Sequence, residues 1–274
     1  AMGGSLRNPA SFCGIVGLRP SPGRVAMNPG TRIDESLSVE GPMARSVEDV
    51  AFLLDCMSGE DWRDPISLPK PGRSFLEEAR SGWKPKKVAY SPGLGFMPCD
   101  PEVAAITRAA AMRFADAGVI VEEAHPDFSD MHWAFRVLRA RSYAAGFAEI
   151  IADPAKRALL KPEVIWNIEI GMKLTGEEVA EAELARFRMF KSTIAFFQTY
   201  DLILSPATIV AAFPVEERWV KRVNGHEFAN YVEWLGIAYA LTMMSCPALS
   251  LPAGFTKEGL PVGLQIAAPP RGEG

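Results

Sequence analysis

GGSLRNPASFCGIVGL, residues 3–18, is the most informative stretch of this 274-residue chain. Two glycines precede Ser5, and a run of small and apolar residues follows it. Because glycine lacks a Cβ atom, a Gly-Gly-Ser turn can bring several backbone N–H groups close to the serine hydroxyl. Donors aimed at one point beside an oxygen nucleophile are what acyl transfer needs. A flexible Gly-Ser linker has a similar composition, but the apolar run 10–18 needs a packing partner. We therefore expect residues 5–18 to be rigid and buried.

The composition is that of an ordinary globular protein, with 48% apolar residues, 23% charged residues and a net charge of −4. No basic stripe indicates nucleic-acid binding. No run of 18 apolar residues predicts a membrane span, and the first residues lack the pattern of a signal peptide. We therefore expect a cytoplasmic protein with neither a nucleic-acid nor a membrane partner.

The four cysteines are scattered and form no C-x-x-C pair, which argues against a zinc site or a disulfide framework. They are Cys13, Cys56, Cys99 and Cys246. We expect buried free thiols in a reducing compartment, and no metal or cofactor.

The first 86 residues predict one helix. Residues 1–45 are rich in proline and lack clean periodicity, which predicts ordered loop with short strands such as 14–18. A helix is predicted over 47–57, with Ser46 as its N-cap and Gly59 as its stop. Residues 61–82 hold three prolines and are predicted to form a surface connection.

The remainder alternates strands and helices. A strand over 87–90, a helix over 101–117 capped by Asp100 and a strand over 119–124 predict a βαβ unit. Helices are predicted over 130–151, 155–173, 176–199 and 228–244, and strands over 201–206, 248–252 and 262–267. The aromatic residues of the middle region are expected to be mostly core. The predicted fold class is α/β, with a mixed, largely buried β-sheet flanked by helices.

Two blocks of the sequence resemble the amidase signature family of serine hydrolases. The first is GGSLRNPASFCGIVGLRPSPGRV followed by SLSVEGPMARSVEDVAFLLDCMSGEDWRDP, and the second is PALSLPAGFTKEGLPVGLQIAAPP. They occur in the family's order, and the segment between them matches weakly. The resemblance implies the amidase signature fold, a small-molecule amide substrate and no cofactor.

The resemblance also implies site residues. In the family, the serine of a Gly-Gly-Ser-x-Arg motif attacks the amide carbonyl, and Ser5 matches it. A lysine accepts the proton through a second serine in cis peptide geometry, which completes a Ser-Ser-Lys triad. Backbone N–H groups before the nucleophile form the oxyanion hole, at positions that correspond to Met2, Gly3 and Gly4. Such a lysine needs a pKa lowered towards neutrality.

The sequence departs from the family pattern at both ends. The family's lysine and second serine precede Gly-Gly-Ser, where this sequence has only Ala1 and Met2, and the family continues beyond the residues that match 261–270. We therefore expect the C-terminal part of an amidase, inactive alone, as a single partial domain over 1–274. Its parts are the motif loop and first helix (1–60), the βαβ unit (87–125), a helical substrate-side region (129–199) and the closing strands (200–274).

Other candidate residues have less support. Arg7 could orient a substrate carboxylate, but a role in holding the motif loop is favoured, and the same holds for Arg45. No local motif marks a catalytic histidine at any of the three positions, His125, His132 and His226.

Substrate contacts are expected from residues 129–143 and 228–244, which carry aromatic and methionine side chains at helical spacing. The open alternatives are a non-catalytic remnant and an amidotransferase subunit of the same fold. Homo-oligomers or self-association are expected, through a face left uncovered by the absent part.

Overall fold

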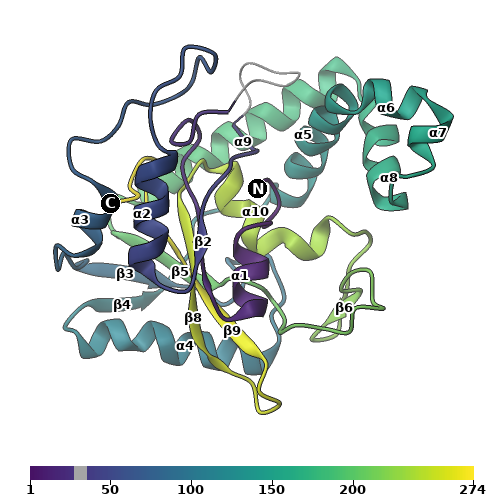
Figure 1. Ribbon diagram of the computed structural model, residues 1–274. Coiled ribbons are helices and arrows are strands. Elements are labelled where there is room, and N and C mark those ends of the chain that lie inside the picture. Colours follow the sequence, from purple (N-terminus) through teal and green to yellow (C-terminus); the bar gives the residue numbers. More distant parts are fainter. Residues whose placement is uncertain (28–35) are drawn as a thin grey trace.

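A mixed seven-stranded sheet organises the computed structural model, which describes residues 1–27 and 36–274 (Figure 1). The strand order is β2-β1-β8-β9-β5-β3-β4. The strands are β1 (Val16–Arg19), β2 (Met43–Ala44), β3 (Lys87–Tyr90), β4 (Ile120–Glu123), β5 (Leu202–Pro206), β8 (Ala248–Phe255) and β9 (Pro261–Ala267). Strand β3 runs parallel to β4 and β5, and the other neighbouring pairs are antiparallel. The predicted α/β class with a mixed sheet is confirmed.

Helices flank this sheet. They are α1 (Arg7–Cys13), α2 (Val47–Met57), α3 (Phe75–Ala79), α4 (Pro101–Asp116), α5 (Met131–Gly146), α6 (Ala148–Ala152), α7 (Pro154–Arg157), α8 (Pro162–Gly171), α9 (Gly176–Phe196) and α10 (Gly236–Met243). A short 3-10 helix, η1 (Glu233–Leu235), leads into α10, and β6 (Arg222–Val223) pairs with β7 (His226–Glu227) as a separate ribbon. Helices α5 to α8 lie together at one side of the molecule (Figure 1).

Local sequence signals explain several of these elements. Helix α2 begins after Ser46, whose Oγ accepts the N–H of Asp49, and it spans the predicted 47–57. Helix α4 begins at Pro101 after Asp100, whose carboxylate accepts the N–H groups of Glu102 and Val103. Strands β3 and β4 are parallel on either side of α4 in the chain, so the predicted βαβ unit is confirmed.

Two stretches predicted as loop contain helices. Residues 7–13 form α1, which ends at Gly14 in the left-handed conformation (φ 64°). Pro9 argued against a helix here, because proline lacks a backbone N–H. Pro9 lies in the first turn of α1, however, where an N–H would have no intrahelical acceptor. Within the predicted connection 61–82, Ser74 and Glu77 form a capping box that starts α3. Both expectations were wrong because short helices leave too few residues to show periodicity.

Three further expectations need correction. The helix predicted over 130–151 is interrupted at Phe147, and that over 155–173 is interrupted before Pro162, which begins α8. Residues 228–244 are helical only from η1 onward. Cys13 and Cys56 are exposed, so the expectation of buried thiols was wrong for them; Cys246 is buried and Cys99 intermediate.

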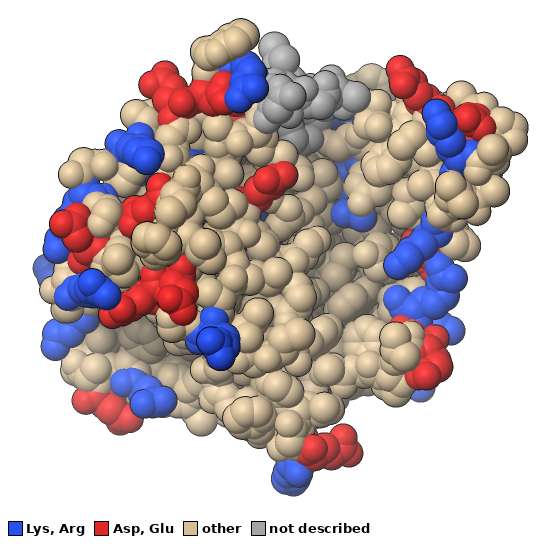
Figure 2. Space-filling view, in the orientation of Figure 1, with Lys and Arg blue, Asp and Glu red and all other residues tan. Residues whose placement is uncertain are grey.

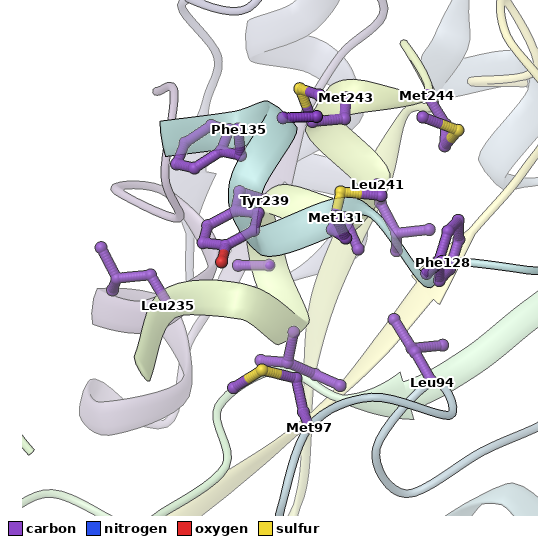
Figure 3. Close-up of a cluster of buried hydrophobic side chains, with 14 of the residues drawn as sticks. Leu94, Met97, Phe128, Met131, Phe135, Leu235, Tyr239, Leu241, Met243 and Met244 are labelled. Carbon is purple, nitrogen blue, oxygen red and sulfur yellow. The ribbon is translucent and has the colours of Figure 1, made fainter. Parts of the chain in front are cut away.

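The largest buried cluster lies between α5, α9 and α10 (Figure 3). Phe135 of α5 stacks on Tyr239 of α10, with ring centroids 3.8 Å apart and planes at 12°. Met131 and Leu138 are fully buried on the same helix. This packing fixes the face of α5 that continues towards the motif loop.

Candidate active site

Helix α1 holds the Gly-Gly-Ser loop against the sheet, packing on β1, β8 and β9. Arg7, the first residue of the helix, is fully buried. Its guanidinium donates to the carbonyl of Ala238 (2.7 Å), Oε1 of Gln265 (2.8 Å) and Oγ1 of Thr242 (3.0 Å). These contacts tie the loop to α10 and β9 and leave no part of Arg7 for a substrate. The motif segment is buried only in part, since Ser5 and Cys13 are exposed and Pro9, Phe12, Gly14 and Ile15 are intermediate.

The loop is closely surrounded at both glycines, but only Gly4 is required by its surroundings. Gly4 has φ 127°, and a Cβ atom there would lie 2.4 Å from Oδ1 of Asn8. At Gly3 a Cβ atom would lie 3.4 Å from Cδ1 of Leu235 and 3.6 Å from Nη1 of Arg139. The loop therefore passes close to α5 and η1, with no room for larger residues at Gly4.

The backbone of this loop has unused donors. In the described residues, the N–H groups of Met2, Gly3, Gly4 and Ser5 donate to no protein acceptor, although Gly3 and Gly4 are buried. Buried backbone N–H groups nearly always have a partner. Unpaired donors beside a serine hydroxyl provide what an oxyanion hole requires.

These donors border a cavity of about 610 Å³, which is within the usual range for small-molecule sites. The remaining wall comes from α1, α5 and the segment around η1. It is lined by Ala1, Met2, Gly3, Gly4, Ser5, Asn8, Pro9, Phe12, Ser38, Arg139, Ser142, Tyr143, Phe147, Tyr231, Trp234 and Leu235. Both segments predicted to contact substrate, 129–143 and 228–244, contribute to this wall. In the space-filling view the same face is hollowed between the body of the molecule and helices α5 to α8 (Figure 2).

No side-chain base for Ser5 lies in the described part of the cavity. Its described lining contains no lysine, no histidine and no carboxylate, and the Ser5 hydroxyl makes no hydrogen bond. His125 Nδ1 contacts the carbonyl of Pro126, and His132 Nδ1 contacts the hydroxyl of Tyr239. Neither these residues nor His226 lines the cavity. Arg45 is exposed and also lies outside it.

Arg139 is the lining residue that the sequence reasoning missed. It is 6% exposed and follows the buried positions Phe135 and Leu138 on α5. An arginine on the apolar stripe of a helix was the available signal, because charged side chains are rarely buried without a partner. Among residues 1–27 and 36–274, no cluster of His, Cys, Asp or Glu could hold a metal ion.

Comparisons with known proteins agree with this geometry. A family model described as Amidase matches residues 2–274. An acylamidase from Rhodococcus erythropolis is 32% identical over 97% of this chain and 56% of its own length. A glutamyl-tRNA(Gln) amidotransferase subunit from Thermus thermophilus is 33% identical over 97% of this chain and 59% of its own.

The fold has a close structural counterpart. The crystal structure of a bacterial aryl acylamidase superposes with a TM-score of 0.89 at 24% identity, over 99% of this chain and 58% of that one. The chain thus spans somewhat less than three fifths of the length of these relatives. Within the part of the chain that the structure describes, no helix is long and apolar enough to span a membrane.

Proposed function

Because the chain belongs to the amidase signature family, we propose that it supplies the nucleophile and the oxyanion donors of an amide hydrolase. The observation that carries the proposal is the group of unpaired N–H donors at Gly3 and Gly4 beside the exposed Ser5 hydroxyl. Ser5 Oγ would attack the carbonyl carbon of the amide, and the oxygen of the tetrahedral intermediate would accept the loop N–H groups, including that of Met2.

Collapse of this intermediate would release ammonia or an amine and leave an acyl group on Ser5. Water would then hydrolyse the ester and regenerate the hydroxyl. A neutral serine is a poor nucleophile, and the described cavity offers it no side-chain base. We therefore assign proton transfer to a lysine and a second serine outside this chain, in the remaining length that the relatives possess. No step requires a cofactor.

An amide-release assay tests whether this chain supplies the nucleophile while a separate segment supplies the base. The chain is assayed alone and together with the lysine-bearing segment that precedes this region in the family, supplied as a separate chain. We expect no turnover alone and measurable turnover of the mixture, which Ser5→Ala abolishes. Ser81→Ala, at an exposed serine that does not line the cavity, is the matched control and should leave turnover unchanged. Turnover by the chain alone that Ser5→Ala abolishes would show that a base lies within it and refute the proposal.

A second candidate is an amidotransferase subunit, in which the same chemistry passes ammonia to a partner. Its support is the 33% identity to a relative of that kind. Co-purification with a second subunit, together with ammonia release that depends on it, would favour this function over free hydrolysis. A non-catalytic remnant would bind amides without turning them over in any mixture.

We also propose that the chain self-associates through α2 and the sheet edge at β2. Phe52 and Met43 are 56% and 41% exposed there, and among residues 1–27 and 36–274 a strand pairs with β2 on one side only. Exposed apolar side chains beside an unpaired strand edge favour association.

A further inference from the structure

We propose that Arg139 binds a carboxylate carried by the substrate, so that the site selects short amides with an anionic group close to the scissile bond. This inference names the substrate class of the hydrolase proposed above and rests on that function. Its test measures binding rather than turnover, so either one can fail independently of the other.

The guanidinium of Arg139 is buried with donors to spare. Nε donates to Oδ1 of Asn167 (3.2 Å) and Nη2 to the hydroxyl of Tyr143 (2.8 Å). Nη1 reaches only the sulfur of Met2, at 3.9 Å. A thioether is a weak acceptor, and a guanidinium carries five N–H groups. The edge of Arg139 that faces the motif loop therefore lacks an oxygen acceptor.

The two fully buried arginines show how this chain holds such a group for structural purposes: their Nη atoms donate to protein oxygens, although the Nε of each has no partner among the described residues. Arg7 donates to three oxygen atoms, and Arg19 donates to backbone carbonyls that include those of Cys246 and Leu37. Neither lines the cavity. Arg139 does line it, and its cavity-facing nitrogen contacts sulfur rather than oxygen.

The charge of Arg139 is uncompensated in the described residues. No carboxylate lies within ion-pair distance of it there, and the described lining of the cavity contains no Asp or Glu. On the other side of Arg139, a second hollow holds Glu163, but both oxygens of that carboxylate bind Arg218, at 2.8 and 2.6 Å. A ligand carboxylate would supply the missing counter-charge in a poorly solvated site, where ion pairing is stronger than in water.

The guanidinium is held in orientation before any ligand binds. Its carbon lies 4.4 Å from the centre of the Tyr143 ring. Asn167 is 1% exposed and donates its own amide to the carbonyl of Glu163. A preorganised planar fork suits two-point binding of a carboxylate.

The same geometry limits the length of the substrate. Nη1 of Arg139 lies 3.6 Å from the position of a Cβ atom on Gly3, and Gly3 is two residues from Ser5. Since consecutive Cα atoms are about 3.8 Å apart, an acyl group that reaches both Ser5 and Arg139 has a spacer of only a few atoms. Succinamate, with two methylene groups between amide and carboxylate, has this size, and succinamide is its neutral isostere.

Isothermal titration calorimetry at pH 8 and low salt compares these two ligands on the 274-residue chain. Burial lowers the pKa of the Ala1 amino group to about 6, so this terminus is neutral at pH 8 and Arg139 is the remaining cation of the described lining. We expect succinamate to bind at least tenfold more tightly than succinamide, since a hydrogen-bonded charge pair is worth about that factor or more. Arg139→Gln should bring the ratio below threefold while binding of succinamide persists, which also shows that the cavity is intact.

Two further variants make the result decisive. Met2→Glu places a carboxylate beside Nη1 and should abolish the preference with Arg139 in place, so the outcome does not depend on the folding of Arg139→Gln. Arg136→Gln removes an exposed arginine from the same helix and should keep the full ratio. Equal affinities of the wild type for both ligands, or a preference that survives Met2→Glu, would overturn the inference. Complementation by the lysine-bearing segment on neutral amides would meanwhile still test the hydrolase function.

Discussion

Gly17→Ala is the perturbation that most directly tests how the sheet positions the active-site loop. Gly17 lies in β1 beneath α1, opposite Ser250 of β8. A Cβ atom there would lie 2.5 Å from the carbonyl oxygen of Leu6 and 2.7 Å from Cβ of Ala10. Ordinary contacts begin at 3.4 Å, so helix and strand would have to separate by about 0.9 Å. Neither opposing atom can move by rotating a side chain.

The magnitude follows from this geometry. Overpacking a well-packed core costs about 1–3 kcal/mol, and rigid backbone on both sides places this site in the upper half of that range. Replacing glycine by alanine also restricts the unfolded chain, which returns about 0.4–1 kcal/mol. We therefore expect a net loss of about 2 kcal/mol in the free energy of unfolding, measured by urea denaturation followed by tryptophan fluorescence.

Gly176→Ala is the matched control. Gly176 begins α9, and no atom of the described residues lies within 4 Å of the position of its Cβ. The same substitution should there be neutral or slightly stabilising, because alanine is the better helix former. Because α1 carries the Gly-Gly-Ser loop, Gly17→Ala should also weaken succinamide binding. A loss of stability below about 0.5 kcal/mol, or an equal loss at Gly176, would refute the reasoning that β1 and α1 are in fixed contact.

Three further predictions follow from burial and exposure. Burial lowers the pKa of His132, so the folded state favours the neutral imidazole. The free energy of unfolding should therefore be highest above pH 6.5 and should fall as the pH drops through and below that value, by at most about 1.4 kcal/mol per pH unit. His132→Gln should reduce the difference in urea midpoint between pH 7.5 and 5.5, and an equal difference in both proteins would contradict this. Burial raises the pKa of Cys246 to about 12. A thiol-specific disulfide reagent at pH 8 should therefore label the exposed Cys13 and Cys56 first and Cys246 only on unfolding. Reaction of all four thiols at one rate would argue against the packing described. Phe52→Glu should shift the chain towards monomer in sedimentation equilibrium. Phe255→Glu, at a position 68% exposed on β8, should not. Identical association of both variants would exclude α2 as the contact.

Sequence signals predicted the elements whose local chemistry is self-contained. Helix α2 has its cap at Ser46 and an apolar stripe along its eleven residues, and α4 has Asp100 and Pro101 at its start. Helix α1 could not be predicted in this way because it spans seven residues and contains a proline. It packs on β1, which follows it directly, and on β8 and β9, which lie at the other end of the sequence, so no local window contains all of these contacts.

The predicted site residues Ser5, Gly3 and Gly4 came from a motif, and the structure places them on a cavity wall. Arg7 was weighed as a possible substrate contact, and its three protein acceptors leave it a structural residue. The aromatic part of the wall could be anticipated only as two segments, since which side chains face the cavity depends on the interruption of the helix at Phe147 and on the approach of η1 to α5.

The sequence alone could not separate Arg139 from Arg7 and Arg19, because all three are arginines beside apolar residues that become buried. What distinguishes them is the set of atoms around each guanidinium. The Nη atoms of Arg7 and Arg19 donate to protein oxygens, among them carbonyls of Ala238 and Cys246, although the Nε of each has no partner among the described residues. Arg139 meets an amide oxygen, a phenol and a thioether, and its remaining donors border open space next to Gly3. A buried cation is costly without an anionic partner. Arg7 bears that cost with neutral acceptors alone, but it lies outside the cavity, whereas Arg139 lines a space that a ligand can enter. The succinamate experiment measures whether an anion binds there.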